Sequence, residues 1–258
     1  MSKVAAFGID AGSTTVKLAA VGEGGQLLWH RIEETEPDLG AQTAAFIRWA
    51  RDRAGVGLEL PLSATGYGRN LVDGAAKKVT EITCHAAGVF RYVGHGGTLI
   101  DVGGQDTKVI IVGGEGRVLD FAMNDKCAAG TGRFLEVCAS RLRFSLGELG
   151  SAALSAGGET PISSTCTVFA ESEIISLIAR GHPVPEIVRG IFRSMLKRVV
   201  GLARSAGIRP PVMLSGGVAR GEAFRTLLAE ELGMEVEVPA LPQIMGAYGA
   251  ALLAANRT

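Results

Sequence analysis

The chain of 258 residues has little of what marks several common protein classes. Aromatic residues make up 5% of it, and its 26 basic and 26 acidic residues balance. Neither a basic surface for nucleic acid nor an acidic tail is therefore indicated. No stretch reaches the ~20 apolar residues that cross a membrane, and the opening MSKVAAFGIDAG reads as a strand rather than a signal region. We expect no nucleic acid and no membrane among its partners.

Cysteine is also scarce, and the four cysteines lie far apart, at Cys84, Cys127, Cys138 and Cys166. They form neither a CxxC pair nor the dense framework of a small disulfide-rich domain. Without an export signal, this pattern favours the reducing cytoplasm, where thiols bind metals or act in catalysis more often than they form disulfides.

Glycine, in contrast, is abundant, with 36 residues. Three short strands joined by glycine-rich turns and followed by helices are predicted twice, over 3–10, 16–22 and 26–33 and again over 97–104, 106–114 and 116–124. Later helices are predicted over 168–180 and 184–206, from Glu222, and over 246–256. This internal repeat predicts an α/β protein of two packed lobes that share a cleft. We place the first lobe at 1–96, with 245–258 packing back on it, and the second at 97–244.

The same turn follows the first strand of each lobe. The strings 9-IDAGSTTVK-17 and 101-DVGGQDTKV-109 place an Asp at the strand end, then glycines and polar side chains, then a return strand. Glycines let backbone N–H groups approach phosphate oxygens, and the Asp can hold Mg²⁺ beside them. One such turn also fits an ordinary hairpin. Two copies, one in each lobe, favour a phosphate clamp.

Other nucleotide-binding signatures are missing. The chain has no GxxxxGK[ST], and 66-GYGRNL-71 and 130-GTGRFL-135 do not match the dinucleotide fingerprint. A third glycine motif, 214-LSGGVA-219, ends a predicted strand and enters a helix. It suits the nucleoside and phosphate side of a cleft, or is a plain strand-to-helix turn.

With these motifs the chain resembles the superfamily of actin, sugar kinases and heat-shock chaperones. Within it, the chain is similar to the ATP-dependent activators of 2-hydroxyacyl-CoA dehydratases and to the ATPase subunits of benzoyl-CoA reductase. The strings that carry this resemblance are 65-TGYGRN-70, 101-DVGGQDTKVI-110, 123-MNDKCAAGTGRFLE-136, 164-STCTVFAESE-173 and 215-SGGVA-219. The resemblance implies two ribonuclease-H-like, actin-type lobes with ATP and Mg²⁺ in the cleft.

The expected nucleotide site draws on all these motifs. Its residues are Asp10, Gly12, Ser13, Thr14, Thr15 and Lys17 in the first turn, Asp101, Gly103, Gly104 and Gln105 in the second, and Gly216, Gly217 and Gln243 beyond them. Gln105 is the catalytic candidate, because its amide can orient a water that attacks the γ-phosphate, although it can also simply cap the turn. Asp106 is expected to point away from the site by strand alternation. Lys17 reaches phosphate or only solvates its strand.

Cys127 and Cys166 each precede a predicted helix, and from the residues alone they are metal ligands or reduced structural thiols. Cys138 falls at helical spacing with Phe134 and Leu142, which favours a core position, and Cys84 is expected to be packed. The resemblance implies that Cys127 and Cys166 are ligands of one [4Fe–4S] cluster that bridges a homodimer. A thiolate-bound cluster is anionic, so the N–H groups at helix N-termini would favour it.

The resemblance thus implies an ATP-hydrolysing electron donor. Reduced ferredoxin or flavodoxin would supply the electron, and a 2-hydroxyacyl-CoA dehydratase or related cluster-containing enzyme would receive it. The alternative is a small-molecule kinase of the same superfamily whose thiols are incidental. The chain has no spare sequence for the substrate-binding insert expected of such a kinase.

Overall fold

The computed structural model describes residues 3–55, 60–163 and 166–256. They form two compact units, each with one mixed sheet. Unit 1 comprises 1–96, 112–119 and 239–258, and unit 2 comprises 97–111 and 120–238. Ser164 and Thr165 of the second cysteine string, and Arg257 and Thr258 at the end of the predicted last helix, lie outside the described residues.

The sheet of unit 1 has the strand order β3-β2-β1-β4-β5. Its strands are β1 (Val4–Ala11), β2 (Thr15–Gly22), β3 (Leu27–Glu34), β4 (Leu62–Thr65) and β5 (Lys77–Lys78). β1 pairs antiparallel with β2 and parallel with β4. In this register Asp10 lies beside Lys17 on one side and beside Thr65 on the other. The first predicted phosphate turn is thus the β1–β2 connection.

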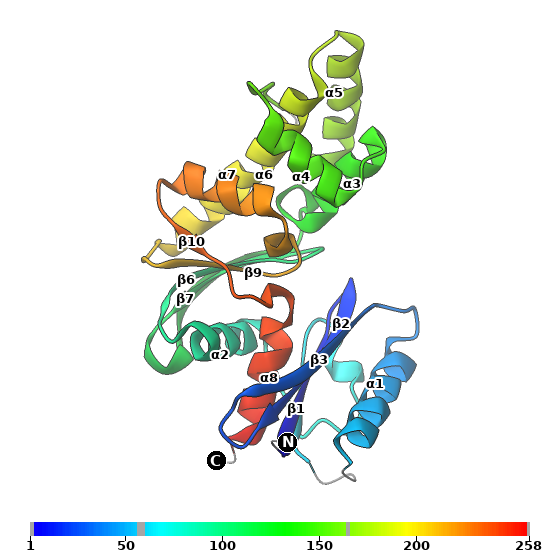
Figure 1. Cartoon of the computed structure of the whole chain (residues 1–258), viewed down its shortest axis with the longest axis vertical. Coiled ribbons are helices and arrows are strands. Elements are labelled where there is room, and N and C mark those ends of the chain that lie inside the picture. The colour runs from blue at the N-terminus through cyan, green and yellow to red at the C-terminus, as the bar shows by residue number, and fades with distance from the viewer. Residues whose placement is uncertain (1–2, 56–59, 164–165, 257–258) are drawn as a thin grey trace. The chain divides into compact units, whose positions relative to one another are not determined.

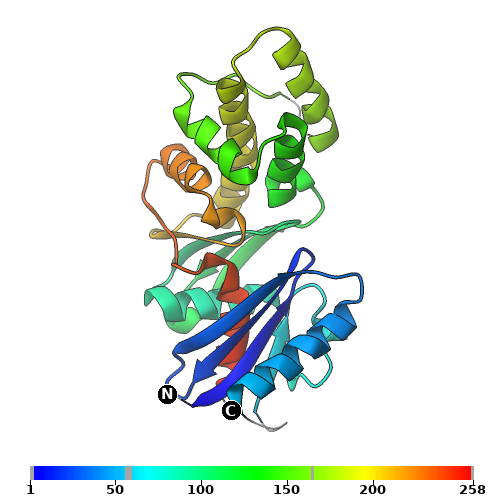
Figure 2. The same ribbon diagram turned by 45° about the vertical axis from the view of Figure 1, so that its right-hand side comes forward.

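Two helices cover opposite faces of this sheet, α1 (Leu39–Ala54) and α8 (Met245–Ala255) (Figures 1 and 2). Alternation along β1 explains the arrangement. Phe7 shares a core cluster with Phe46 of α1, whereas Gly8 meets the α8 backbone so closely that a Cβ would lie 2.1 Å from Ala247 O. Asp38 caps α1, because its side chain accepts the Ala41 N–H at 2.9 Å.

α8 also packs on α2 (Glu81–Val93), and the two helix backbones touch where they cross. A Cβ on Gly88 would lie 2.1 Å from Met245 O, and one on Gly249 would lie 1.8 Å from Cys84 O. Only glycine permits so close a crossing. The crossing brings the start of α8 directly over the side chains of the first turns of α2.

The sheet of unit 2 repeats the plan, with the strand order β8-β7-β6-β9-β10. Its strands are β6 (Gly97–Val102), β7 (Thr107–Val112), β8 (Val118–Asn124), β9 (Val212–Ser215) and β10 (Val236–Glu237). β6 pairs parallel with β9 and places Asp101 beside Ser215. Both faces of β6 are buried, including the side chains of Thr98 and Asp101.

Five helices of unit 2 gather on one side of its sheet (Figure 1). They are α3 (Gly132–Leu142), α4 (Leu146–Ser155), α5 (Thr167–Ala179), α6 (Val184–Ala206) and α7 (Glu222–Leu232). One core joins them to the sheet, and α6 contributes nine buried residues to it. Short 3₁₀ turns occupy 69–71, 114–116, 128–130, 218–220 and 242–244.

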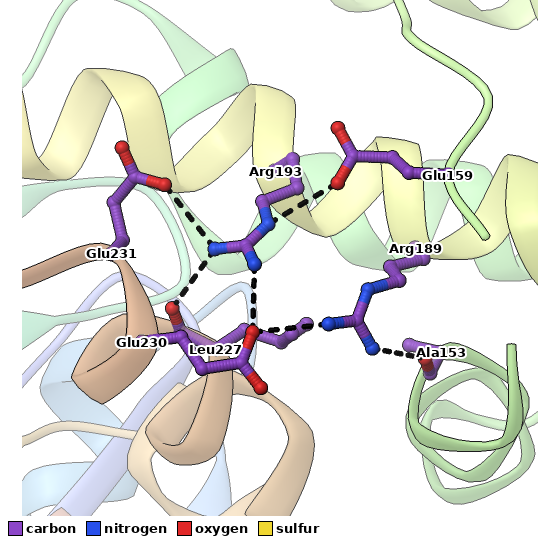
Figure 3. Close-up of polar contacts among 7 residues, drawn as sticks. All are labelled: Ala153, Glu159, Arg189, Arg193, Leu227, Glu230 and Glu231. Atoms are coloured by element: carbon purple, nitrogen blue, oxygen red, sulfur yellow. Dashed lines mark hydrogen bonds and ion pairs between the residues drawn. The ribbon is translucent and has the colours of Figure 1, made fainter. Parts of the chain in front are cut away.

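Charged side chains tie α6 to its neighbours at the edge of this core (Figure 3). Arg193 contacts Glu159 at 3.2 Å, Glu230 at 2.7 Å and Glu231 at 3.2 Å, and Arg189 contacts Glu230 at 3.0 Å. A network of several charges around one guanidinium stabilises more than an isolated surface pair. We assign it a structural role in fixing α7 against α6.

Most predicted elements are present within a few residues of their expected bounds, but α4 was not predicted. Ser145 begins it with a capping box, since its hydroxyl lies 3.3 Å from the Glu148 N–H and Glu148 accepts the Ser145 N–H at 2.7 Å. Within the described part of the chain, no helix combines the length and the hydropathy needed to cross a membrane.

Candidate functional site: two carboxylate–lysine turns and the cysteine segments

The first turn holds a buried carboxylate beside a lysine. Asp10 is 5% exposed at the end of β1, and its Oδ2 lies 3.1 Å from Lys17 Nζ. A Cβ on Gly12 would lie 2.8 Å from Thr15 O and 3.0 Å from Lys17 Nζ, so the tight turn requires glycine there. Thr35 supports the turn from β3, donating its hydroxyl to Gly12 O at 2.8 Å. The Lys17 side chain therefore pairs with Asp10 at the turn and is not simply exposed to solvent on its strand.

The second turn repeats this arrangement with a lysine that our sequence analysis missed. Lys108 is 3% exposed, and its Nζ lies 3.7 Å from Asp101 Oδ2 and 2.6 Å from Asp106 Oδ2. The expectation that Asp106 points away was wrong, because Asp106 lies in the turn before β7 begins, where strand alternation does not yet apply. The signal was present: lysine follows the aspartate by seven residues in both turns.

A hydroxyl residue and a left-handed glycine flank the carboxylate in each unit. Thr65 ends β4 beside Asp10, and Ser215 ends β9 beside Asp101. Gly66 and Gly216 follow them. The two glycines have φ values of 93° and 91°. A Cβ on Gly66 would lie 2.5 Å from Ala11 O, and one on Gly216 would lie 2.3 Å from Val102 O. The SGG motif is therefore the counterpart of TG in 65-TGYGRN-70, a correspondence that the sequence analysis did not identify.

The two units hold their carboxylates differently. Ser215 donates its hydroxyl to Asp101 Oδ1 at 2.8 Å. In unit 1 the Thr65 hydroxyl is buried and makes no such bond to Asp10. Burial raises the pKa of the Cys84 thiol, and Thr65 lowers it in part. The imidazole of buried His85 approaches Asp10 across Gly246.

The remaining predicted nucleotide residues lie at or near these turns. Ser13 and Thr14 are exposed at the tip of the first turn, Thr15 begins β2, and Gln105 is exposed in the second turn. Gly103 donates its N–H to Asp106 O at 2.9 Å, which closes that turn, and Gly104 is half-buried beside it. Gly217 precedes a single 3₁₀ turn, and α7 begins only at Glu222. Gln243 lies in unit 1, in the 3₁₀ turn before α8.

The second turn is bonded directly to the start of α3. Gly103 O accepts the Gly132 N–H at 2.9 Å, and Gly104 O accepts the Arg133 N–H at 2.8 Å. The Thr131 hydroxyl donates to Gly104 O at 3.1 Å. The first N–H groups of a helix have no partner within it, and here the carbonyls of the turn supply partners. Gly103 and Gly104 are therefore bonded to the start of the helix that follows the Cys127 segment.

The four thiols fall into two groups. Cys84 and Cys138 are 0% and 1% exposed, and burial raises the pKa of each to about 12, so both are protonated at neutral pH. Cys127 is half-buried and Cys166 is exposed. The core position expected for Cys138 is confirmed. Only thiols that solvent or a metal can reach are available as ligands.

Cys127 precedes its helix, as expected, but a short turn separates the two. It precedes the single 3₁₀ turn 128–130, and α3 begins at Gly132 with its first N–H groups already bonded to the second turn. Asn124 instead holds this segment, donating its side-chain N–H to Cys127 O at 2.9 Å. Cys166 does directly precede its helix, α5. Among the described residues, no three His, Cys, Asp or Glu side chains are arranged so that they could hold a metal ion together.

Duplicated sheets with a carboxylate–lysine turn in each define an actin-like ATPase fold. Solved structures bear this out. A ROK family glucokinase from Streptomyces griseus aligns with a TM-score of 0.62 at 17% identity, covering 96% of this chain and 98% of that one, which shows the fold alone. The fold class predicted from the sequence is confirmed.

Residues 7–254 match the BadF/BadG/BcrA/BcrD ATPase family, and the chain belongs to that family. It is 40% identical to the (R)-2-hydroxyglutaryl-CoA dehydratase activating ATPase of Acidaminococcus fermentans over 96% of each chain. The crystal structure of component A of that dehydratase aligns with a TM-score of 0.91, covering 97% of each chain at 41% identity. The 2-hydroxyisocaproyl-CoA dehydratase activator of Clostridioides difficile is 47% identical over 74% of this chain and 71% of its own length.

Proposed function

We propose that this protein is an ATP-hydrolysing activator that delivers a low-potential electron to a partner 2-hydroxyacyl-CoA dehydratase or a related reductase. The observation that carries the proposal is the 40% identity, over nearly the whole chain, to a relative named as such an activating ATPase. The relatives described above are dehydratase activators, so we do not retain the kinase alternative. The glucokinase likeness extends only to the fold.

In this proposal the two turns bind the phosphates of ATP. Backbone N–H groups of Gly12 to Thr15 and of Gly104 and Gln105 approach phosphate oxygens, and Lys17 supplies positive charge. The Gly103 N–H closes the second turn instead, by its bond to Asp106 O. The donor set at each turn fits Mg²⁺, which is commonly held by one or two carboxylates together with water and phosphate oxygens. Asp10 and Asp101 would hold it. Gly216, Gly217 and Gln243 complete the proposed nucleotide-binding residues.

Gln105 has the position expected of a residue that orients the hydrolytic water. Its side chain is exposed in the second turn, next to the backbone proposed to bind the γ-phosphate. The Asp106 carboxylate forms an ion pair with Lys108 at 2.6 Å. This pairing makes Asp106 a poorer candidate for the general base. Positioning and electrostatic stabilisation account for most of the catalysis of phosphoryl transfer, so an orienting amide is sufficient for this role.

Cys127 and Cys166 are the proposed ligands of a [4Fe–4S] cluster. Of the four thiols, these two are the accessible ones. A [4Fe–4S] cluster needs four thiolates, so one chain supplies half of them. A twofold axis presents the same pair again, so we propose a homodimer with one bridging cluster. When bound, the cluster takes up and gives up one electron, with reduced ferredoxin or flavodoxin as the proposed donor.

The bonds between the second turn and α3 support coupling between the two activities. A nucleotide shifts a conformational equilibrium only if it interacts differently with the two states. A γ-phosphate bound at Gly103 and Gly104 would change their carbonyl positions, and those carbonyls hold Gly132 and Arg133. We propose that the Cys127 segment responds to ATP through this contact.

Reconstitution tests the proposal. The anaerobically purified protein is incubated with a partner dehydratase, dithionite and Mg·ATP, and turnover of the 2-hydroxyacyl-CoA is followed. We expect turnover that requires both ATP and this protein. ATP hydrolysis without any activation of dehydratases or benzoyl-CoA reductases would contradict the activator role.

A further inference from the structure

Buried His85 is not accounted for by the motifs of the proposed site. It lies in the second turn of α2 and is 5% exposed. An imidazole is costly to bury unless its nitrogens meet polar groups. The question is therefore what the ring faces.

The crossing of α2 and α8 answers it. A Cβ placed on Gly246 would lie 2.7 Å from His85 Nε2 and 3.2 Å from Asp10 Oδ2. Both atoms therefore approach the same point above the Gly246 backbone, His85 from α2 and Asp10 from β1. The contacts of Gly88 and Gly249 bring the helices close enough for the ring to reach across. Any side chain at position 246 would displace the imidazole, the carboxylate or both.

The other unit shows what such a neighbour does. In unit 2, Ser215 donates a hydrogen bond to Asp101 and so fixes the carboxylate from the side opposite Lys108. The equivalent hydroxyl in unit 1, that of Thr65, is buried and makes no such hydrogen bond. Asp10 instead has Lys17 at 3.1 Å and the approach of His85 across Gly246.

We propose that His85 is a positioning residue of the ATP site: its Nε2 side holds the Asp10 carboxylate in place for Mg·ATP, as Ser215 holds Asp101. The inference rests on the proposed role of Asp10. His85 acts through that carboxylate and touches neither nucleotide nor metal. Neighbours that orient a metal-binding carboxylate typically change metal affinity by about 10–100-fold when they are removed.

Three variants separate positioning from packing. The amide nitrogen of Gln reaches the place of an imidazole Nε2, whereas that of Asn reaches only the place of Nδ1. His85→Gln should therefore keep near-normal behaviour, and His85→Asn and His85→Leu should lose it. Cys84→Ala is the matched control, because it removes a fully buried side chain from the same helix turn without removing an imidazole.

The measurements are Mg²⁺ titrations at fixed nucleotide, read out by calorimetric binding of ADP and by the initial rate of ATP hydrolysis. We expect His85→Asn and His85→Leu to raise the Mg²⁺ concentration at half-saturation by at least tenfold in both readouts. We expect His85→Gln and Cys84→Ala to change it less than threefold. Far-ultraviolet circular dichroism and the thermal midpoint report folding in every variant.

Gly246→Ala provides an independent route to the same effect. Its methyl group would displace the ring from Asp10, so it should raise the Mg²⁺ requirement as His85→Leu does, and the double variant should be no worse than either single variant.

Equal Mg²⁺ dependence in His85→Leu and wild type would overturn the inference while leaving the proposed function intact. A His85→Gln protein as defective as His85→Leu would assign the residue to packing and would also overturn it. Wild-type protein that neither binds nor hydrolyses Mg·ATP would overturn the proposed function and this inference together. If His85→Leu does not fold, the comparison between Gln and Asn decides the question.

Discussion

The two carboxylate–lysine turns share a plan and differ in how deeply their charges are buried. In unit 1, the Lys17 side chain is 14% exposed beside Asp10. In unit 2, the side chains of Lys108 and Asp101 are each 4% exposed, and Lys108 also meets Asp106. A buried lysine is costly to leave without its carboxylate, whereas a more accessible one can turn toward water or a ligand. The difference supports the proposal that Lys17 contacts phosphate, whereas Lys108 is buried between the two carboxylates of its own turn.

The largest expected effect comes from removing the buried charge. Asp101→Asn removes one of the carboxylates beside Lys108. Losing one partner of a buried pair typically costs about 3–5 kcal/mol, here toward the lower end because Asp106 remains. Asp10→Asn should cost clearly less, because Lys17 can reach solvent. Urea unfolding of both variants measures the difference. Equal destabilisation would remove the distinction between the two turns.

Gln105→Ala should lower the rate of ATP hydrolysis by about 100-fold, an effect of the size found when one catalytic hydrogen-bonding group is removed. Nucleotide affinity should change little, because the backbone groups of the turn remain. Steady-state hydrolysis and equilibrium binding of ADP are the two measurements. An unchanged rate of ATP hydrolysis would show that Gln105 only caps its turn and has no part in catalysis.

Gly132→Ala tests the contact that only the second turn makes. Its Cβ would lie 3.0 Å from Gly103 O and 3.1 Å from Val218, so the turn and α3 must shift apart. We expect ATP hydrolysis within about threefold of wild type but at least a tenfold loss of ATP-dependent partner turnover, since allosteric couplings of about 1–3 kcal/mol correspond to 5–150-fold.

The control for this variant is Gly201→Ala in α6, where a Cβ meets nothing within 4 Å. It should be neutral or slightly stabilising, because alanine favours helix. Equal partner turnover in Gly132→Ala and Gly201→Ala would refute coupling through the turn.

The smallest effect concerns the buried thiols and alkaline pH. Burial raises the pKa of Cys84 and Cys138 from 9.0 to about 12, so folding favours the protonated form. Their contribution to stability is complete below the unfolded pKa and is lost as the pH rises from about 9 toward 12. Cys138→Ala should therefore show a shallower fall in unfolding midpoint over that range than wild type. An identical slope would mean that the thiol does not titrate as inferred.

The fold could be predicted from the sequence because the turn between two strands recurs at Asp10 and Asp101 with the same polar pattern. The core position of Cys138 could be predicted because helical spacing identifies the buried face of a helix. Sequence reasoning missed Lys108, although the spacing of seven residues was visible, and it missed the kinship of Thr65–Gly66 with Ser215–Gly216, which depends on parallel strand register. The bonds from Gly103 and Gly104 to α3, and the approach of His85 across Gly246, join segments distant in sequence, and no local pattern encodes them. The division into lobes at residue 97 and the roles of the site residues stay predictions.

The contrast between accessible and buried thiols offers the most direct test of the electron-donor account. Iron, acid-labile sulfide and visible absorbance are measured on wild type and on single Cys→Ala variants after anaerobic reconstitution. The account predicts about one four-iron cluster per dimer in wild type and in Cys138→Ala, and its loss in Cys127→Ala and Cys166→Ala while ADP binding is retained. A colourless wild-type protein, or a Cys138→Ala variant that bleaches while Cys166→Ala keeps its cluster, would contradict it.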